Sequence, residues 1–246
     1  MAVLVTRPHP DNEATSAALR ARGFEALLAP MLRFEPLPFR DDGADIRAVI
    51  ASSANAIRAA VPALVQSRLL QLPLYAVGKH TAAAAREAGF VNVISADKDA
   101  AALRDLIIAD LPKKKRKQAV LLYLAGADLS RDLAGELGER GLDVVTVTTY
   151  RMVPLLTLPR DTCAAFRANG VEAVLHYSAR TAQAFVEAVR GEGLEISALA
   201  LPQCCISATV ASVLHEAGAM QVSVAASPDE SGLLGALERA LRPSLA

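Results

Sequence analysis

Tyr150 has a side chain that could take part in catalysis, and it lies in an internal repeat at a position where the two copies differ in polarity. The segment Glu139–Pro154 repeats Ala21–Pro36, 118 positions earlier, and Leu32 takes the place of the tyrosine in that first copy. A phenol, with a pKa of about 10, is protonated at neutral pH and can donate a proton or a hydrogen bond to a departing hydroxyl group. It could equally be a strand tyrosine that packs its ring and leaves its hydroxyl in water. The pattern leaves both interpretations open.

Hydroxyl-bearing and basic residues recur where a predicted strand passes into a predicted helix. In doubly wound sheets this edge binds ligands, and a helix N-terminus offers an anion its free N–H groups and the positive end of its dipole. Serine and threonine also cap helices whatever the function, so capping alone would explain any one of them. The candidate ligand-binding residues at these edges are Arg7, Ser53, Asn55, Gly78, Thr81, Ser178, Arg180 and Thr209.

The elements that would position these residues form two similar halves. Ser53 aligns with Ser178 at an offset of 125 positions, and Val77–Gly89 aligns with Ile206–Gly218 at an offset of 129. Three repeated segments in the same order, with slowly growing offsets, indicate an internal duplication. The predicted strands are short, apolar on both faces and alternate with helices, which is typical of parallel sheets built from βαβ units. The sequence therefore predicts an α/β protein with two doubly wound parallel-sheet domains.

Both copies of the first repeat carry the same boundary signals. In each, a glycine follows a predicted helix, at Gly23 and Gly141, where a helix C-cap favours left-handed backbone. An apolar run follows and ends at a proline, which has no N–H to donate to a strand ladder. Within this plan we expect Glu25–Phe34 to be extended, and a helix from Ala54 to about Leu70 that contains Pro62.

Composition excludes several classes of partner. The chain has 246 residues with 26 basic and 26 acidic side chains, so it has no long-range field to attract nucleic acid or an anionic membrane. The basic run Lys113–Lys117 could bind anions, but a solvated loop is the simpler interpretation. Cys163, Cys204 and Cys205 lack metal-binding spacing, so we expect reduced thiols and no metal site. No apolar run approaches the length of a membrane span, and no signal peptide is evident, so we expect a soluble cytoplasmic protein.

Familiar catalytic and nucleotide-binding motifs are missing from the sequence. No G-x-G-x-x-G follows a predicted strand, and G-x-x-x-x-G-K-[ST], H-E-x-x-H and G-x-S-x-G are absent. The four histidines are scattered, and we expect each to be satisfied locally. His176 is of most interest because it adjoins the loop that contains Tyr177 and Ser178. A nucleotide-using enzyme is therefore disfavoured, whereas a non-catalytic two-lobed binder of a small anion remains an alternative.

Several motifs, in a fixed order, resemble the uroporphyrinogen-III synthase family. They are VLVTRP at residues 3–8, SSANAI at 52–57, VGKHTA at 77–82, TYR at 149–151, YSARTA at 177–182 and ISATVA at 206–211. The likeness covers nearly the whole chain. No single motif is diagnostic, and the resemblance depends on the order and spacing of the set.

The resemblance implies how the two halves are connected. One domain would comprise residues 1–34 and 155–246 and the other residues 37–149, because the chain in this family crosses between domains twice. The two crossings, at 34–37 and 149–155, would form a two-stranded linker. The active site would lie in the cleft between the domains, and we expect the protein to be a monomer.

The resemblance also implies a reaction that needs no cofactor. A linear hydroxymethylbilane would lose water and cyclise with inversion of its last ring, so the enzyme would be a lyase that makes uroporphyrinogen III for tetrapyrrole (haem) biosynthesis. Tyr150 matches the tyrosine thought to assist the departure of hydroxide in this family. Thr81 matches a threonine that faces the cleft, and Ser178 matches a serine in the equivalent loop of the other domain.

The sequence departs from the family pattern at two positions. Ser207 stands where the family commonly has glycine, and Val210 stands where it commonly has a second threonine that faces the cleft. Thr209, one position earlier, is the candidate to supply the missing hydroxyl group.

Overall fold

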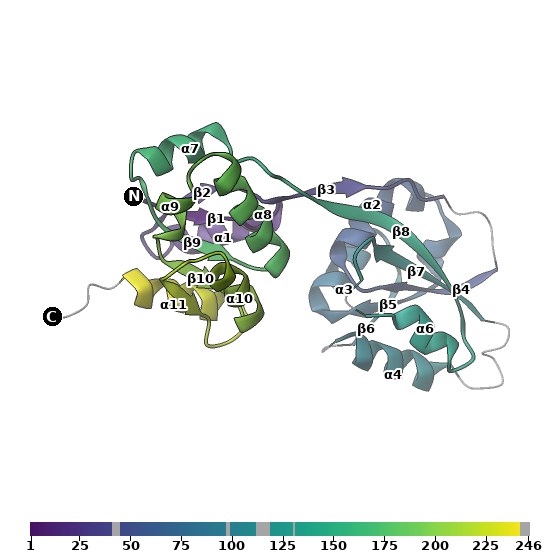
Figure 1. The fold of residues 1–246 in the computed structure, drawn as a ribbon. Coiled ribbons are helices and arrows are strands. Elements are labelled where there is room, and N and C mark those ends of the chain that lie inside the picture. Colours follow the sequence, from purple (N-terminus) through teal and green to yellow (C-terminus); the bar gives the residue numbers. More distant parts are fainter. Residues whose placement is uncertain (41–44, 97–98, 112–118, 130, 242–246) are drawn as a thin grey trace. The chain divides into compact units, whose positions relative to one another are not determined.

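The structure, a computed structural model, describes residues 1–40, 45–96, 99–111, 119–129 and 131–241. The chain divides into two compact units: unit 1 comprises Met1–Phe34 and Val153–Ala246, and unit 2 comprises Glu35–Met152. Each unit has a sheet with helices on both of its faces (Figure 1). The basic run Lys113–Lys117, for which the sequence favours a solvated loop over an anion-binding site, lies outside the described residues.

Unit 1 is built on a sheet of five parallel strands in the order β11-β10-β9-β1-β2. The strands are β1 (Ala2–Val5), β2 (Glu25–Leu28), β9 (Val171–His176), β10 (Gln203–Cys205) and β11 (Val222–Val224). The helices are α1 (Asp11–Arg20), α7 (Arg160–Arg167), α8 (Ala179–Gly191), α9 (Glu195–Leu199), α10 (Ala208–Glu216) and α11 (Glu230–Leu241).

Strand β1 shows how both faces of this sheet are filled. Side chains alternate along a strand, so Val3 and Leu4 point to opposite faces, and both are fully buried. Val3 shares a hydrophobic cluster with Leu19 of α1 and Leu233 of α11. Leu4 belongs to a second cluster, with Phe185 of α8. Both faces are therefore covered, which is the usual environment of a parallel sheet.

Unit 2 is built on a six-stranded sheet in the order β3-β8-β7-β4-β5-β6, and its strands from β8 to β6 are parallel. The strands are β3 (Leu32–Pro36), β4 (Ile46–Ala51), β5 (Pro73–Val77), β6 (Asn92–Ala96), β7 (Val120–Gly126) and β8 (Asp143–Pro154). The helices are α2 (Ala54–Leu64), the 3-10 helix η1 (Arg68–Gln71), α3 (Gly78–Glu87), α4 (Ala100–Asp110) and α6 (Leu133–Gly138). Val49 of β4 packs with Ile57 of α2 on one face, and Ile50 packs with Leu103 of α4 on the other.

Strand β3 pairs with β8 in antiparallel orientation. The Leu37 N–H donates to the Thr149 carbonyl at 2.7 Å, and the Leu155 N–H donates to the Met31 carbonyl at 2.9 Å. Residue numbers therefore rise along one strand as they fall along the other. These are the two segments in which the chain passes from one unit to the other, and they form an antiparallel ladder.

The two sheets have the same spatial order of equivalent strands but a different chain order. Across the sheet, unit 1 has β2, β1, β9, β10 and β11, and unit 2 has β8, β7, β4, β5 and β6. The repeated segments fall on equivalent elements, because Ser178 follows β9 and Ser53 follows β4. Gly23 and Gly141 precede β2 and β8, with φ of 83° and 81°, the left-handed conformation that the sequence predicts. The prediction of duplicated, doubly wound α/β units is confirmed.

The segment Glu25–Phe34, predicted to be extended, contributes to two strands. The strands β2 and β3 lie in different sheets, and Pro30 lies between them. The predicted helix over Ala54–Leu70 is too long. Helix α2 ends at Leu64, two residues after Pro62, since proline removes a helical hydrogen bond. Helices α7 and α9 lie in segments for which no helix is predicted from the sequence.

Candidate active site

Each sheet has a topological switch point, where successive connections leave in opposite directions. It lies between β1 and β9 in unit 1 and between β7 and β4 in unit 2. Doubly wound sheets bind ligands in the crevice outside the carboxyl ends of these strands. Arg7 and Tyr177 follow the two strands of unit 1, whereas Ser52 follows β4 and Gly126 ends β7 in unit 2. The candidate residues of each unit therefore gather at its expected ligand-binding edge.

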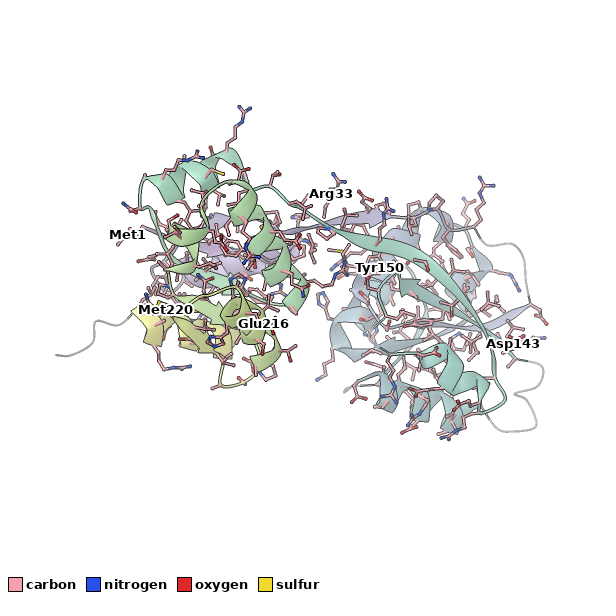
Figure 2. All side chains as sticks on the ribbon, in the orientation of Figure 1. Met1, Arg33, Asp143, Tyr150, Glu216 and Met220 are labelled. Carbon is pink, nitrogen blue, oxygen red and sulfur yellow. The ribbon has the colours of Figure 1, made fainter. Side chains whose placement is uncertain are left out.

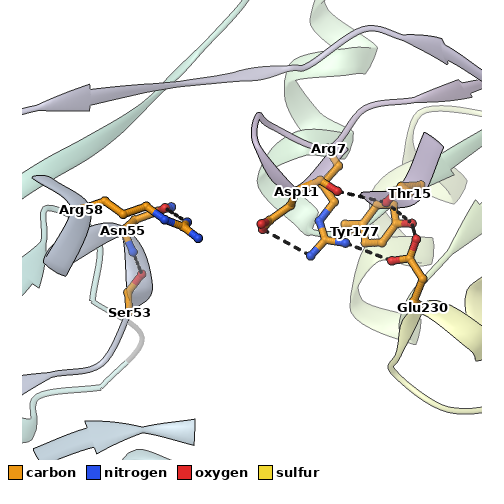
Figure 3. A network of polar contacts seen from close by, with 8 residues as sticks. All are labelled: Arg7, Asp11, Thr15, Ser53, Asn55, Arg58, Tyr177 and Glu230. Carbon is orange, nitrogen blue, oxygen red and sulfur yellow. Dashed lines mark hydrogen bonds and ion pairs between the residues drawn. The ribbon is translucent and has the colours of Figure 1, made fainter. Parts of the chain in front are cut away.

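Tyr150 lies on β8 (Figure 2). It pairs with Gly126, the last residue of β7, at the switch point of unit 2. Its hydroxyl donates a hydrogen bond to Ser53 Oγ at 3.2 Å. Ser53 is the N-cap of α2, and its Oγ also accepts the Asn55 N–H at 3.2 Å. Asn55 is held in turn by Arg58, whose Nη1 donates to Asn55 Oδ1 at 3.0 Å (Figure 3). The tyrosine is therefore partly packed on the core, yet its hydroxyl is directed to a polar group.

Gly126 allows the Tyr150 ring to take this place. A Cβ atom added at residue 126 would lie 2.7 Å from Tyr150 Cζ and 2.9 Å from its hydroxyl oxygen. Such distances are far below van der Waals contact, so any other residue would displace the ring. The Ala127 N–H also donates to the Tyr150 carbonyl at 2.9 Å, which fixes the backbone of β8 beside β7. The end of β7 therefore positions the phenol.

A pocket of about 410 Å³ opens at this point of unit 2. Four hydroxyl-bearing residues line it, together with three charged ones, Asp99, Asp128 and Arg131. The hydroxyl-bearing residues are Ser52, Ser53, Tyr123 and Tyr150. A larger groove of about 800 Å³ runs beside Phe39 and Pro62, but none of the predicted site residues lines it. We therefore assign the smaller, polar pocket as the candidate site.

Tyr123 is a member of this pocket that the sequence patterns missed. Its hydroxyl lies 2.7 Å from Ser52 Oγ, and its ring is almost completely buried. Burial raises the pKa of Tyr123, against a smaller lowering by its hydrogen bond with Ser52, so the phenol stays protonated at neutral pH. A signal existed in the sequence, because a tyrosine inside an apolar strand needs a partner for its hydroxyl.

Unit 1 carries a charged cluster at its own switch point (Figure 3). The Arg7 guanidinium lies 4.6 Å from the centre of the Tyr177 ring and pairs with Glu230 at 3.0 Å and with Asp11 at 3.3 Å. The Tyr177 hydroxyl donates to Glu230 Oε1 at 2.9 Å and lies 3.2 Å from Thr15 Oγ1. Burial, with the Glu230 carboxylate adding to it, raises the pKa of Tyr177. The predicted anion ligand Arg7 is therefore already engaged by two carboxylates.

The other predicted site residues mostly occupy helix starts. Ser178 caps α8 in a reciprocal capping box: its Oγ accepts the Thr181 N–H at 3.1 Å, and its own N–H donates to Thr181 Oγ1 at 3.2 Å. Gly78 begins α3 with a positive φ of 72°, and Thr81 is buried in the first turn of that helix. Arg180 is half-buried in the first turn of α8.

Val210, which stands where the family commonly has threonine, is buried, and the neighbouring Thr209 is exposed. Val210 is buried in the core of unit 1, with only 2% of its surface exposed. Thr209, the candidate replacement, is exposed in the first turn of α10. Ser207 is the N-cap of that helix, in extended backbone that requires no glycine. Val210 therefore packs in the core, and Thr209 presents its hydroxyl group at the surface.

His176 is a core residue of unit 1. The Gln203 amide nitrogen donates to the carbonyls of Ala198 and Leu201, so Gln203 Oε1 is the acceptor that faces His176 Nε2, 2.9 Å away. The proton of the neutral ring therefore lies on Nε2. Burial lowers the pKa of His176 to about 4, against a smaller opposing effect of Gln203. The ring is neutral at physiological pH and packs edge-on against Phe185.

The cysteines and the acidic residues give no sign of a metal centre in the part of the chain that the structure describes. All three cysteines are buried and unpaired by disulfides, and burial raises the pKa of Cys204 and Cys205. No group of three or more His, Cys, Asp or Glu side chains is arranged there to hold a metal ion. Among the same residues, no helix has the length and apolar character needed to span a bilayer.

These features define an α/β protein of two duplicated, doubly wound units that carries a hydroxyl-lined pocket at a strand switch point. Residues 13–235 match the model of the uroporphyrinogen-III synthase HemD family, and the chain belongs to that family. It is accordingly an enzyme of tetrapyrrole synthesis that acts on a tetrapyrrole substrate, and the alternative of a non-catalytic anion binder is not favoured. The resemblance noted in the sequence is confirmed.

Solved structures support the same fold. The uroporphyrinogen-III synthetase of Helicobacter pylori is 19% identical with a TM-score of 0.66, and the alignment covers 98% of this chain and 99% of that one. A mutant uroporphyrinogen III synthase of Thermus thermophilus is 21% identical with a TM-score of 0.55 and the same coverage. Comparison with curated protein sequences gave no significant match.

Proposed function

We propose that the protein is a lyase that converts hydroxymethylbilane to uroporphyrinogen III, with loss of water, ring closure and inversion of the last ring. The observation that supports this most directly is the hydrogen bond from Tyr150 to Ser53 Oγ, 3.2 Å long, at the wall of the unit 2 pocket. A phenol held beside a weak acceptor can exchange that acceptor for a substrate hydroxyl group. Tyr150 is therefore our candidate for the group that assists the first step.

The first step removes water from the substrate. The bond from the terminal methylene carbon to its hydroxyl oxygen breaks, the pyrrole nitrogen releases its proton, and an electrophilic azafulvene remains. Tyr150 donates its hydroxyl hydrogen to the departing oxygen, and the proton released by the pyrrole nitrogen restores the phenol. Positioned general acids typically contribute about 10²–10⁴-fold in rate. We expect the lower end, because a phenol is a weak acid and an electron-rich pyrrole ionises readily.

The later steps rearrange carbon–carbon bonds. The substituted carbon of the last ring attacks the azafulvene carbon and forms a spiro intermediate. One bond of that intermediate breaks and re-forms at the other α-carbon, which inverts the ring, and loss of a proton restores its aromaticity. No step changes the net oxidation state, so the proposed reaction requires no redox cofactor. The enzyme's main task is to hold the chain in the conformation that leads to inversion.

Binding of an eight-carboxylate substrate has to depend on local donors, because the chain has no net charge. Helix N-termini supply such donors through their free N–H groups and dipoles. We propose that the start of α2, with Ser53 and Asn55, and the start of α3, with Gly78 and Thr81, bind substrate carboxylates. Further proposed ligands are Arg7, Ser178, Arg180 and Thr209.

A product assay tests the proposal directly. The protein is incubated briefly with freshly generated hydroxymethylbilane, and the products are oxidised and resolved into the type I and type III isomers. We expect type III in excess, whereas spontaneous closure in the absence of protein gives type I. Tight binding with only type I product would indicate a binder instead of a synthase. We further propose that the protein is cytoplasmic and that it is a monomer. Gel filtration would test the monomer against the chain mass of 25.8 kDa.

A further inference from the structure

We propose that Tyr123 is a positioning residue: through Ser52 it anchors the turn between β4 and α2, so that Ser53 is held where Tyr150 reaches it. The inference rests on the proposed role of Tyr150 in the reaction. Ser52 and Ser53 are the two residues between the end of β4 and the start of α2, and each bonds one tyrosine. The turn is therefore held at two successive side chains.

The two tyrosines approach this turn from opposite faces of the sheet. Tyr123 belongs to the hydrophobic cluster that contains Ile50, whereas the ring of Tyr150 packs on the cluster that contains Val49. Val49 and Ile50 are neighbours on β4 and point to opposite faces, as successive strand residues do. A movement of the turn toward either face would therefore stretch one of the two hydroxyl contacts. Two contacts from opposite sides fix the turn better than one.

Tyr123 is suited to this role because its own position is rigid. Its side chain is 2% exposed and lies on β7, between β4 and β8 in the sheet. The ring is held by the core, and a buried hydroxyl normally keeps a hydrogen-bonding partner. Ser52 Oγ, 2.7 Å away, is that partner. The buried position of Tyr123 on β7 thus fixes the position of Ser52 and, through the peptide bond between them, that of Ser53.

Strand β7 also controls the other half of the pair. Its last residue, Gly126, leaves the space in which the Tyr150 ring lies, and the next residue, Ala127, donates its N–H to the Tyr150 carbonyl. One strand therefore positions both the donor and the acceptor of the Tyr150–Ser53 hydrogen bond. The hydrogen bond of Tyr123 is made to Ser52, so its effect on this pair would be indirect.

The test compares Tyr123→Phe with Ser52→Ala and with a matched control, Tyr75→Phe. Tyr75 is equally buried and belongs to the same cluster as Tyr123, on β5, which β4 separates from β7 in the sheet. Its hydroxyl bonds Asp110. Asp110 ends α4, whose first residue lines the pocket, so this bond lies about 15 Å along the helix from the site. The control therefore loses a buried hydroxyl without touching the proposed site.

We expect Tyr123→Phe and Ser52→Ala each to lower kcat about tenfold with little change in KM, below the usual effect of removing a general acid. Tyr75→Phe is expected to keep kcat within about twofold, the usual outcome for a site with no shared partner. In a Tyr150→Phe background, Tyr123→Phe should have no further effect on kcat, because it acts through Tyr150. An equal loss of kcat in both backgrounds, or a loss in the Tyr75 control as large, would overturn the proposal.

A crystal structure of Tyr123→Phe gives a readout that does not depend on activity. We expect the distance from Tyr150 Oη to Ser53 Oγ to exceed hydrogen-bonding range in this variant, whereas Tyr75→Phe keeps the bond. An unchanged bond in Tyr123→Phe would refute the positioning role even if the enzyme forms type III product normally. Conversely, a wild-type protein that forms no type III product would refute the proposed function, while the distance would still report on Tyr123.

Discussion

Tyr150 donates its hydroxyl hydrogen to Ser53 Oγ across 3.2 Å, although 97 positions separate the two residues in the sequence. The topology explains the contact, because β8, which carries the tyrosine, and β4, which precedes the serine, both flank β7. Ser53 is fixed as the cap of α2, and Gly126 leaves room for the phenol ring. Any catalytic role of this pair therefore depends on the Tyr150 hydroxyl, on helix α2, which holds Ser53, and on the end of β7, which leaves room for the ring.

Tyr150→Phe removes the hydroxyl and keeps the ring. We expect kcat to fall about 10²-fold, the lower end of general-acid effects. Thermal stability and product affinity should change little, because the ring still packs on the unit 2 core. The residual activity should still give the type III isomer, since the shape of the bound substrate determines which carbon attacks. A variant with wild-type turnover would reduce Tyr150 to a packing residue.

Gly126→Ala should disable the same tyrosine without changing it. The added Cβ would lie 2.7 Å from Tyr150 Cζ, so the ring has to move and its bond to Ser53 lengthens. We expect a loss of kcat that approaches that of Tyr150→Phe, and no further loss when the two changes are combined. Gly138→Ala is the control, because a Cβ there meets nothing within 4 Å. Full activity in Gly126→Ala would contradict the assigned position of the ring.

The sequence patterns predicted the features that depend on short stretches of chain. Ser53 and Ser178 were expected at strand-to-helix junctions, and both are N-caps. Gly23 and Gly141 were expected in left-handed backbone, and both have it. Each of these predictions needs only a residue type and its immediate neighbours. The parallel α/β architecture follows from the same local signals, because strands alternate with helices along the chain.

Contacts between distant segments could not be predicted in this way. Ser52 and Tyr123 are 71 positions apart, and Arg7 and Glu230 are 223 apart. Periodicity assigns residues to strands and helices, but strand order in the sheet decides which ends meet. Local patterns therefore identified the candidates Ser53 and Arg7 but neither the second tyrosine of the pocket nor the carboxylate that engages the arginine.

Stability should depend on pH through His176. Its pKa falls from an ordinary value of 6.5 to about 4 in the folded protein, so only the unfolded chain binds a proton between these values. The free energy of unfolding should therefore be highest above pH 6.5 and fall as the pH drops toward 4, by up to about 3 kcal/mol. Denaturant unfolding between pH 7 and pH 5.5, above the main titration range of carboxylates, would measure the upper part of this slope.

Two variants distinguish the contribution of His176 to this pH dependence from that of other residues. His176→Gln should reduce the slope, because no proton is then bound at this position on unfolding. His9→Gln is the control at an exposed histidine and should change the slope less than His176→Gln does, since the His9 side chain is 70% exposed. NMR titration gives a direct check, because the His176 Cε1 proton should keep its neutral-ring shift down to about pH 5. A titration near pH 6.5 would contradict the buried, neutral state.

Glu230 should modulate anion binding by Arg7. Its carboxylate accepts from Arg7 and from the Tyr177 hydroxyl, so it occupies the donors that a substrate carboxylate would use. Glu230→Gln removes the charge and leaves a side chain of the same shape. We expect KM to fall by at most about fivefold, because a partly exposed ion pair is worth about 1 kcal/mol or less. Initial-rate kinetics at low ionic strength would measure this change, since salt screens such pairs.

Glu238→Gln is the matched control for Glu230→Gln. Glu238 lies on the same helix, α11, and pairs with Arg22 at 3.2 Å, away from the switch point of unit 1. Its replacement should leave KM unchanged, whereas Arg7→Gln should raise KM and abolish the effect of Glu230→Gln in the double variant. A rise of KM in Glu230→Gln would mean that the carboxylate holds Arg7 in its binding position. The same measurement therefore distinguishes a carboxylate that competes with substrate from one that orients the arginine.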